Sequence, residues 1–280
     1  MGKVRVVTDS TVDLDDDVLE KFEIEVVPLS LHIDGQTYID RVDITAKEFM
    51  QKMKEAEELP KSSQPPVGEF LQVYDRLHEE GYDVLSIHMT GGMSGTVQSA
   101  ESAASMAKGN VKVVDSRYIS RALSFQVIEA ATMAKAGKSM DEILEAVAKI
   151  RDNTRLFVYV DTLENLIKGG RIGKGKGIIG SLLNIKPIAS LEGGVYTPVT
   201  KVRSHSKAAK FLAEEFAKDV KGKTIKCVSI AHAEGLELTQ KIKKAIFEFT
   251  GYEQIDVVFT TPVISTHTGP GAIGFMYYFE

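Results

Sequence analysis

The sequence predicts an α/β protein of two domains, and two contrasting patterns support that prediction. In residues 1–153, short apolar runs alternate with helical patterns, which is typical of βαβ units and a mainly parallel sheet. In residues 154–280, two strand-like runs flank Leu191-Glu-Gly-Gly194, a hairpin signal that indicates antiparallel pairing. We therefore expect an N-terminal α/β domain and a C-terminal α+β domain with a largely antiparallel sheet, divided near Asn153.

The elements of the first domain have local signals. Buried apolar runs predict strands over residues 3–8, 84–88 and 111–114. Two capping boxes, Thr45-Ala-Lys-Glu48 and Ser139-Met-Asp-Glu142, predict helices that run to about residues 57 and 151. Prolines 65 and 66 suit the start of another helix. Further helices are expected over residues 95–107 and in a long segment that ends near residue 136.

The second domain mixes strands and helices in a different order. Asp161 and Glu164 suggest a capping box for a helical segment over residues 162–168. Residues 266–272 are expected to form a loop because they are rich in turn residues. Helices are predicted over residues 205–220 and 236–250, and strands over residues 156–160, 185–190, 195–200, 225–232, 254–260 and 275–279.

Composition excludes several classes of protein. The chain has 280 residues and a net charge of -5, so it lacks the strongly basic character of a nucleic-acid-binding domain. Cys227 is the single cysteine, which excludes a disulfide framework and suits a reducing cytoplasm. No apolar run approaches the roughly 20 residues of a membrane helix, and the N-terminal apolar stretch is too short for a signal peptide. We expect a cytoplasmic protein.

The segment Thr90-Gly-Gly-Met-Ser-Gly-Thr96 follows a predicted strand and opens a predicted helix. Unpaired backbone N–H groups at a helix start attract a carboxylate or a phosphate, and the hydroxyls of Ser94 and Thr96 add donors. A plain turn with a capping serine explains the same residues. A third interpretation is the nucleophile elbow G-x-S-x-G, which would make Ser94 the nucleophile of a hydrolase, although Thr96 replaces its last glycine.

A glycine-rich stretch over residues 169–177 resembles two nucleotide-binding motifs. Gly170, Gly175 and Lys176 fit G-x-x-x-x-G-K, while Gly175, Gly177 and Gly180 fit G-x-G-x-x-G. Both motifs require a strand directly before the loop, and the preceding residues look helical, so we reject both. The remaining prediction is a basic loop that docks an anionic partner, or a solvated loop, with Lys168, Arg171, Lys174 and Lys176 as its cations.

Three other polar segments could contact a ligand. Ser62 and Ser63 either cap the following helix or direct hydroxyls to a ligand. His267 lies among turn residues, and Arg203 ends a predicted strand, where a guanidinium can pair with a carboxylate or a phosphate. Asp9 is expected to anchor neighbouring loops. No H-E-x-x-H or comparable spacing appears, so we predict neither a metal nor a cofactor.

Taken together and in this order, the polar segments resemble the DegV family. The matching motifs span nearly the whole chain: Thr8-Asp-Ser-Thr11, Ser62-Ser-Gln-Pro65, Ser94-Gly-Thr96, Asp115-Ser116, Gly169-Gly-Arg-Ile172, Lys201-Val-Arg203 and His267-Thr-Gly-Pro-Gly271. The resemblance implies a two-domain protein that binds one long-chain fatty acid between its domains. It further implies that a separate ATP-dependent kinase subunit phosphorylates the bound carboxylate, so that this chain is not an enzyme by itself.

The resemblance also implies roles for individual residues. The carboxylate-binding residues would be Ser62, Ser63, Ser94, Gly95, Thr96, His267 and Thr268. Arg203 and His267 would support phosphorylation of the acyl group, and Arg171, Lys174 and Lys176 would dock the kinase. Such a carrier makes at most transient contact with a membrane surface. Two alternatives remain open: a lipid carrier or sensor without a kinase, and a serine hydrolase of acyl esters that uses Ser94.

Overall fold

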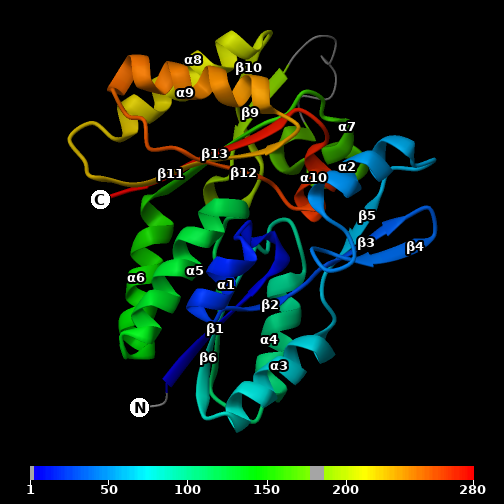
Figure 1. The fold of residues 1–280 in the computed structure, drawn as a ribbon, viewed down its shortest axis with the longest axis vertical. Coiled ribbons are helices and arrows are strands. Elements are labelled where there is room, and N and C mark those ends of the chain that lie inside the picture. Colours follow the sequence, from blue (N-terminus) through cyan, green and yellow to red (C-terminus); the bar gives the residue numbers. More distant parts are fainter. Residues whose placement is uncertain (1–2, 177–185) are drawn as a thin grey trace.

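The computed structural model describes residues 3–176 and 186–280, and these residues form three β-sheets with helices around them (Figure 1). The chain has the expected mixed α/β architecture, with one parallel sheet and one sheet in which antiparallel pairing dominates. Ile185, Gly177 and Gly180, which belong to a predicted strand and a rejected nucleotide motif, lie outside the described residues.

The first sheet is parallel throughout and has the strand order β2-β1-β6-β7. Both of its faces are covered by helices, which is the usual arrangement for a parallel sheet. Helices α3 and α4 pack on one face, and α5 on the other, with α6 behind it. The elements are β1 (Lys3–Asp9), α1 (Asp16–Phe22), β2 (Glu25–Val27), α3 (Val67–Glu79), β6 (Tyr82–His88), α4 (Thr96–Met106), β7 (Val111–Asp115), α5 (Ser120–Lys135) and α6 (Met140–Asn153).

The second sheet has six strands in the order β10-β9-β8-β13-β11-β12. Its neighbours pair antiparallel except for β11 and β12, which are parallel. Its outer face is covered by α8 and α9 (Figure 1). The elements are β8 (Thr154–Tyr159), α7 (Glu164–Lys168), β9 (Lys186–Ser190), β10 (Thr197–Val202), α8 (His205–Asp219), β11 (Ile225–Ala233), α9 (Leu236–Thr250), β12 (Asp256–Phe259), α10 (Pro262–Thr268) and β13 (Ala272–Phe279).

A third, three-stranded antiparallel sheet was not predicted. It consists of β3 (Ser30–Ile33), β4 (Gln36–Ile39) and β5 (Lys61–Ser63), with β3 in the middle. The predicted helix that begins at the capping box is present as α2 (Ala46–Glu55). Because Ser62 and Ser63 lie in β5 and Pro66 is the N-cap of α3, the first of the two alternatives for these serines, that they cap the helix, is wrong.

Two other local predictions are corrected. The capping box of Asp161 and Glu164 is absent, since Leu163 is the N-cap of α7 and Thr162 accepts the hydrogen bond from the Glu164 N–H. Residues 266–268, expected in a loop, form the last turn of α10. That helix begins with Pro262 at its first turn, a position that favours proline, but its β-branched residues conceal it in the sequence.

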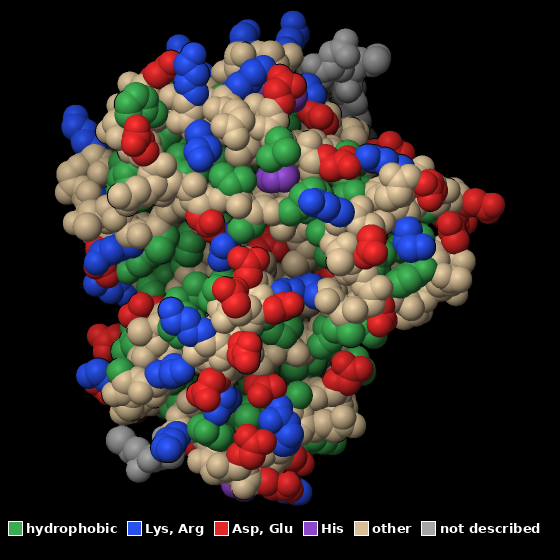
Figure 2. Space-filling view, in the orientation of Figure 1, with side chains coloured by type: hydrophobic (Ala, Val, Ile, Leu, Met, Phe, Trp, Pro, Cys, Tyr) green, Lys and Arg blue, Asp and Glu red, His purple; other side chains and the backbone are tan. Residues whose placement is uncertain are grey.

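The largest apolar cluster joins the six-stranded sheet to the three-stranded sheet, through Leu31 and Ile33 of β3. It combines the inner face of the six-stranded sheet with residues of α2, α5, α6, α7 and α10. On the face shown in Figure 2, basic and acidic side chains are interspersed, and the surface is hollowed between the part that carries α8 and α9 and the part that carries α1 and α5. Within the described residues, no helix combines the length and the apolar character that a bilayer span requires.

Candidate functional site

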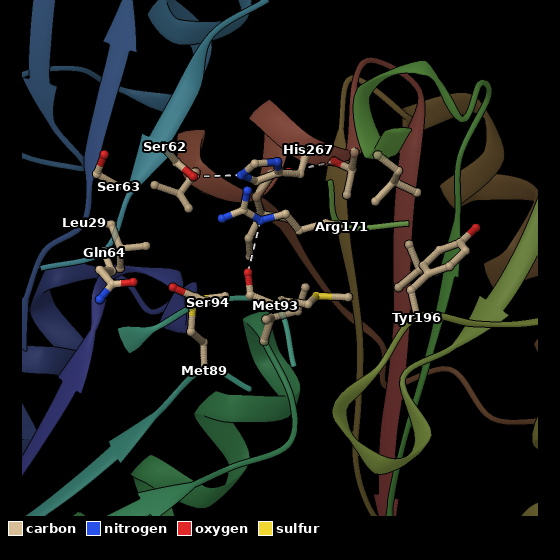
Figure 3. A pocket seen from close by; sticks show the side chains of 16 residues that line it. Leu29, Ser62, Ser63, Gln64, Met89, Met93, Ser94, Arg171, Tyr196 and His267 are labelled. Carbon is tan, nitrogen blue, oxygen red and sulfur yellow. Dashed lines mark hydrogen bonds between the residues drawn. The ribbon is translucent and has the colours of Figure 1, made fainter. Parts of the chain in front are cut away.

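A cavity of about 280 Å³ lies where the three sheets meet. Its walls come from both halves of the chain, and one end is polar while the other is apolar (Figure 3). The polar lining residues are Ser62, Ser63, Gln64, Ser94, Arg171, His267 and Thr268, and the others are Leu29, Met89, Met93, Ile119, Val158, Leu166, Tyr196, Val263 and Ile264.

The polar end is organised by a hydrogen bond between Ser62 and His267. Ser62 Oγ lies 2.7 Å from His267 Nε2, so β5 and α10 are joined across the cavity (Figure 3). Ser63, the next residue of β5, instead bonds His32 Nε2 through its hydroxyl at 2.8 Å. Successive side chains of a strand point to opposite faces, which explains why the two serines differ.

His267 is held in a setting that favours its neutral form. Burial, helped by the positive charge of Arg171, lowers the pKa of His267 to about 4. Its Nδ1 has no hydrogen-bond partner among the described residues. Gly169 fits closely against this nitrogen, since a Cβ at residue 169 would lie 2.4 Å from it. The glycine in the sequence Gly169-Gly-Arg-Ile172 therefore allows the loop to approach the imidazole.

Arg171 provides the positive charge of the polar end. It is half-buried, and its Nε donates to the Met93 carbonyl at 3.1 Å while Nη1 donates to the Gly169 carbonyl at 2.6 Å. Burial lowers the pKa of the guanidinium. Within residues 3–176 and 186–280 no carboxylate forms an ion pair with Arg171, so an anionic ligand would meet a cation already fixed in place. This placement differs from the exposed docking residue that the sequence predicts.

Ser94 lies just before α4 and faces the cavity (Figure 3). Its Oγ bonds Thr96 Oγ1 at 2.8 Å and accepts from the Thr96 N–H at 3.3 Å. Gly95 is the N-cap of α4 and has no side chain to satisfy the first-turn N–H groups, so this end of the helix favours an anion. Thr96 itself is fully buried.

The loop that carries Ser94 is anchored by residues of both halves. Asp115 accepts from the Gly91 N–H, and Thr90 Oγ1 donates to the Gly194 carbonyl at 2.8 Å. The predicted anchoring role of Asp9 is confirmed: its buried carboxylate accepts from the N–H groups of Thr11 and Met89. Burial pushes the pKa of Asp9 up, but its contact with the imidazole of His88 and these hydrogen bonds outweigh burial and lower it.

The apolar end of the cavity continues toward the six-stranded sheet. A second space of about 30 Å³ shares Ile119, Val158, Ile264 and Thr268 with the first. Thr268 Oγ1 donates to the Ile264 carbonyl at 3.0 Å, so its hydroxyl is satisfied by the backbone rather than by the cavity. The two spaces together offer a path from a polar end to an apolar interior.

The structure brings together only part of the predicted site. Ser62, Ser63, Ser94, Arg171, His267 and Thr268 line the cavity, whereas Gly95 and Thr96 support it from behind. Lys174, Lys176 and Arg203 are exposed and do not line it. Lys168 pairs with Glu164 on α7. These exposed cations are available to a partner rather than to a ligand in the cavity.

Sequence reasoning missed the apolar lining and one polar residue. Gln64 donates to Ser99 Oγ at 2.9 Å and packs over Gly95, where a Cβ would lie 2.0 Å from Gln64 Oε1. The sequence did contain a signal for Gln64, because it directly follows Ser62 and Ser63. The apolar residues gave none, because residues that line a cavity and residues of a core have the same side chains.

Ser94 is poorly placed as a hydrolase nucleophile. Ser94 Oγ bonds the hydroxyl and the N–H of Thr96, and the histidine of the site bonds Ser62 instead. A chain of contacts from Asp9 through His88 to Ser86 has the residue types of a catalytic triad, but all three side chains are fully buried. Nucleophilic catalysis requires that the substrate can reach the nucleophile, so these three buried residues have a structural role in the core.

No group of three or more His, Cys, Asp or Glu side chains in residues 3–176 and 186–280 is arranged to hold a metal ion. The glycine-rich stretch from residue 169 follows the helix α7 and not a strand, in agreement with our rejection of the nucleotide motifs. The described site therefore offers hydroxyl donors, one half-buried cation and one neutral imidazole beside an apolar path.

Comparison with known proteins finds relatives over the full length. A family described as "Uncharacterised protein, DegV family" matches residues 3–280. A DegV domain-containing protein of Listeria innocua is 47% identical over 279 residues, which cover 99% of each chain. Two solved structures are similar: a DegV family protein of Thermus thermophilus reported for fatty acid binding (33% identity, TM-score 0.91, 99% of each chain) and the fatty-acid-binding DegV of Bacillus subtilis (32%, 0.88, 100% of each chain).

Proposed function

Because this chain belongs to the DegV family, we propose that it binds one long-chain fatty acid in the described cavity and presents its carboxylate to a separate ATP-dependent kinase. The kinase would form an acyl-phosphate, and this chain would contribute the substrate rather than the ATP site. We further propose that the chain has two domains, 1–153 and 154–280, that the cavity lies between them, and that the protein works in the cytoplasm with at most transient contact with a membrane surface.

The observation that supports fatty acid binding best is the polarity gradient along the cavity. Burying a tail of about 16 carbons could contribute roughly 12 kcal/mol, at about 0.8 kcal/mol per CH₂, before the costs of association are subtracted. A carboxylate is costly to bury without hydrogen bonds. The cavity gathers donors at the end where Ser62, Ser94 and Arg171 lie, so an amphiphile with a single anionic head fits it.

The head group has complementary donors in this proposal. The Ser62 and Ser94 hydroxyls and the N–H groups at the start of α4 donate to the carboxylate, and Arg171 supplies the opposite charge. In this arrangement His267, held neutral by burial, carries its proton on Nε2 and donates it to Ser62 Oγ, which leaves the Ser62 hydroxyl proton for the carboxylate. The carboxylate thus gains hydrogen bonds from neutral donors, and the positive charge beside it, Arg171, is already held in place by its own hydrogen bonds.

The kinase partnership rests on exposed cations that the cavity does not use. Lys174 and Lys176 are exposed on the segment that continues from Arg171, and Arg203 is exposed between β10 and α8. Cations on a protein of net charge -5 would steer an acidic patch of a partner toward this region. Arg203 would contact the transferring phosphoryl group or the kinase surface, with His267 at the carboxylate.

Two tests separate the parts of this proposal. Organic extraction of the purified protein, followed by mass spectrometry and a direct fatty acid titration, checks binding. A stoichiometric free fatty acid supports it, while an empty extract together with no binding in the titration refutes it. Acyl-phosphate formation with the cognate kinase and ATP then distinguishes a kinase subunit from a carrier or sensor that acts without a kinase. Turnover of acyl esters that is lost in Ser94→Ala would instead favour the hydrolase.

A further inference from the structure

Small side chains form a row across the inner face of the six-stranded sheet, beside the cavity. Ala231 of β11 pairs with Gly274 of β13, and Gly274 pairs with Val158 of β8. All three line the second, smaller space, and Val158 also lines the main cavity. The neighbouring pair on the same face, Ala233 and Ala272, is small as well. The floor of this space is therefore backbone and methyl groups.

The opposite face of the same strands carries large residues. In β13 the side chains alternate, and Ile273, Phe275 and Tyr277 pack in the separate cluster beneath α8 and α9. Phe275 and Tyr277 are fully buried there. The small residues of these strands thus lie on the face toward the cavity, so space for an alkyl chain remains on that side of the sheet.

Polar residues at the second space turn their hydroxyls away from it. Ser120 and Thr260 both line the space, but both hydroxyls donate to the buried carboxylate of Asp13, the Thr260 bond measuring 2.8 Å. Asp13 also accepts from the Thr261 N–H at 2.9 Å. An alkyl chain in this space would therefore meet no unsatisfied hydroxyl of Ser120 or Thr260.

Two long side chains stand just beyond the small row. Leu156 of β8 pairs with Met276 of β13, two residues along the strands from Val158 and Gly274. Met276 is fully buried, and its methyl carbon lies 3.0 Å from the position that a Cβ on Gly274 would take. The path that begins at the polar end and crosses the small row therefore meets a wall of larger side chains.

From this arrangement we propose that the protein selects fatty acids by acyl chain length, with Ala231 and Gly274 as the floor of the channel end and Leu156 and Met276 as its wall. This inference rests on the proposed function, and it names the residues that determine which fatty acids bind. A methylene that fits within the channel adds about 0.8 kcal/mol, or about fourfold in affinity, and one that meets the wall adds none. Residues at the far end thus set the preferred length without touching the carboxylate.

The test is a competition among saturated fatty acids of about 12 to about 20 carbons, a range in which each methylene changes affinity measurably. Delipidated protein is equilibrated with the equimolar mixture, separated, extracted and analysed by mass spectrometry. Ala231→Val narrows the channel, and Met276→Ala opens its wall. Met106→Ala removes the same atoms from a methionine that is 63% exposed on α4, and is the matched control.

We expect Ala231→Val to shift the bound distribution to shorter chains and Met276→Ala to shift it to longer ones, by about fourfold for each methylene excluded or admitted. Met106→Ala should keep the wild-type distribution. Because the two channel variants act in opposite directions, a folding defect in one leaves the other informative. An unchanged distribution in a folded Met276→Ala protein would overturn the length selection while leaving fatty acid binding intact. A wild-type protein that binds no fatty acid would overturn both.

Discussion

Ser62 Oγ and His267 Nε2 lie 2.7 Å apart, although 205 positions separate the two residues in the chain. The bond joins the short strand β5 to the short helix α10 at the polar end of the cavity. Neither element has a strong signal of its own in the sequence, so the contact depends on the packing of the three sheets.

Ser62→Ala should weaken fatty acid binding by roughly tenfold or more, because a hydrogen bond to a charged group contributes about 1.5–3 kcal/mol. Ser63→Ala is the matched control on the same strand. Its hydroxyl bonds His32 on the other face, so we expect a smaller loss. Titration of both variants with a fluorescent fatty acid measures the difference. Equal losses in the two variants would contradict the division of roles between the two serines.

The low pKa of His267 predicts a dependence of stability on pH. In the folded protein the pKa is about 4, below its usual value of 6.5, so the unfolded state binds more protons between these two values. This contribution to the free energy of unfolding is present above pH 6.5 and is lost as the pH falls toward 4, by up to roughly 3 kcal/mol. Urea unfolding of the wild type and of His267→Gln across that range checks it.

Bound fatty acid should raise the pKa of His267, because a nearby carboxylate favours the charged imidazole. While the fatty acid carboxylate stays ionised, affinity should therefore increase as the pH falls through the raised pKa that His267 has in the complex. The imidazole resonances of His267 in an NMR titration, with and without ligand, report the shift directly. Identical titration curves in the two states would place the carboxylate away from this histidine.

Gly169→Ala should displace the imidazole and disrupt the site. A Cβ at residue 169 would lie 2.4 Å from His267 Nδ1, and the backbone φ of -74° is compatible with alanine, so the effect comes from the contact and not from backbone strain. We expect roughly tenfold weaker fatty acid binding, as for loss of the Ser62 hydrogen bond. Gly68→Ala, at a helical position with nothing within 4 Å, is the control. It should be slightly stabilising, by up to about 1 kcal/mol.

The kinase partnership predicts effects at exposed cations that spare fatty acid binding. Reversing charge in Lys174→Glu with Lys176→Glu should weaken kinase docking by roughly tenfold at low salt and reduce its salt dependence. Arg203→Ala should lower acyl-phosphate formation by roughly tenfold or more if its guanidinium meets an anion in the complex. Fatty acid affinity, measured in parallel, should stay at the wild-type value in each variant, since none of the three residues lines the cavity.

Strong local signals predicted the fold well, and weak ones did not. The capping boxes at Thr45 and Ser139 are both present, since each depends on residues three positions apart. The strand β5 has only three polar residues, and α10 is short and rich in β-branched residues, so their structures depend on tertiary contacts. In such segments tertiary packing overrides the local propensity of the residues.

The site could be predicted only through its polar residues. The resemblance drew attention to Ser62, Ser94 and His267, which line one cavity, but it grouped Arg171 with exposed lysines. The sequence predicts that a side chain on a glycine-rich loop is exposed, and it does not show that neighbouring elements partly bury this one. Ile119, Val158 and Ile264 could not be identified, because burial in a core and exposure to a cavity require the same apolar character.

The largest apolar cluster takes residues from both sides of position 153, and Asp13, near the end of β1, accepts hydrogen bonds from Thr260 and Thr261. A chain divided at that position would leave each fragment with a large exposed apolar surface, and Asp13 would keep the Ser120 hydroxyl but lose its donors Thr260 and Thr261. The two halves should consequently denature in one cooperative transition. Fragments produced separately should aggregate, and regain solubility only when they are produced together.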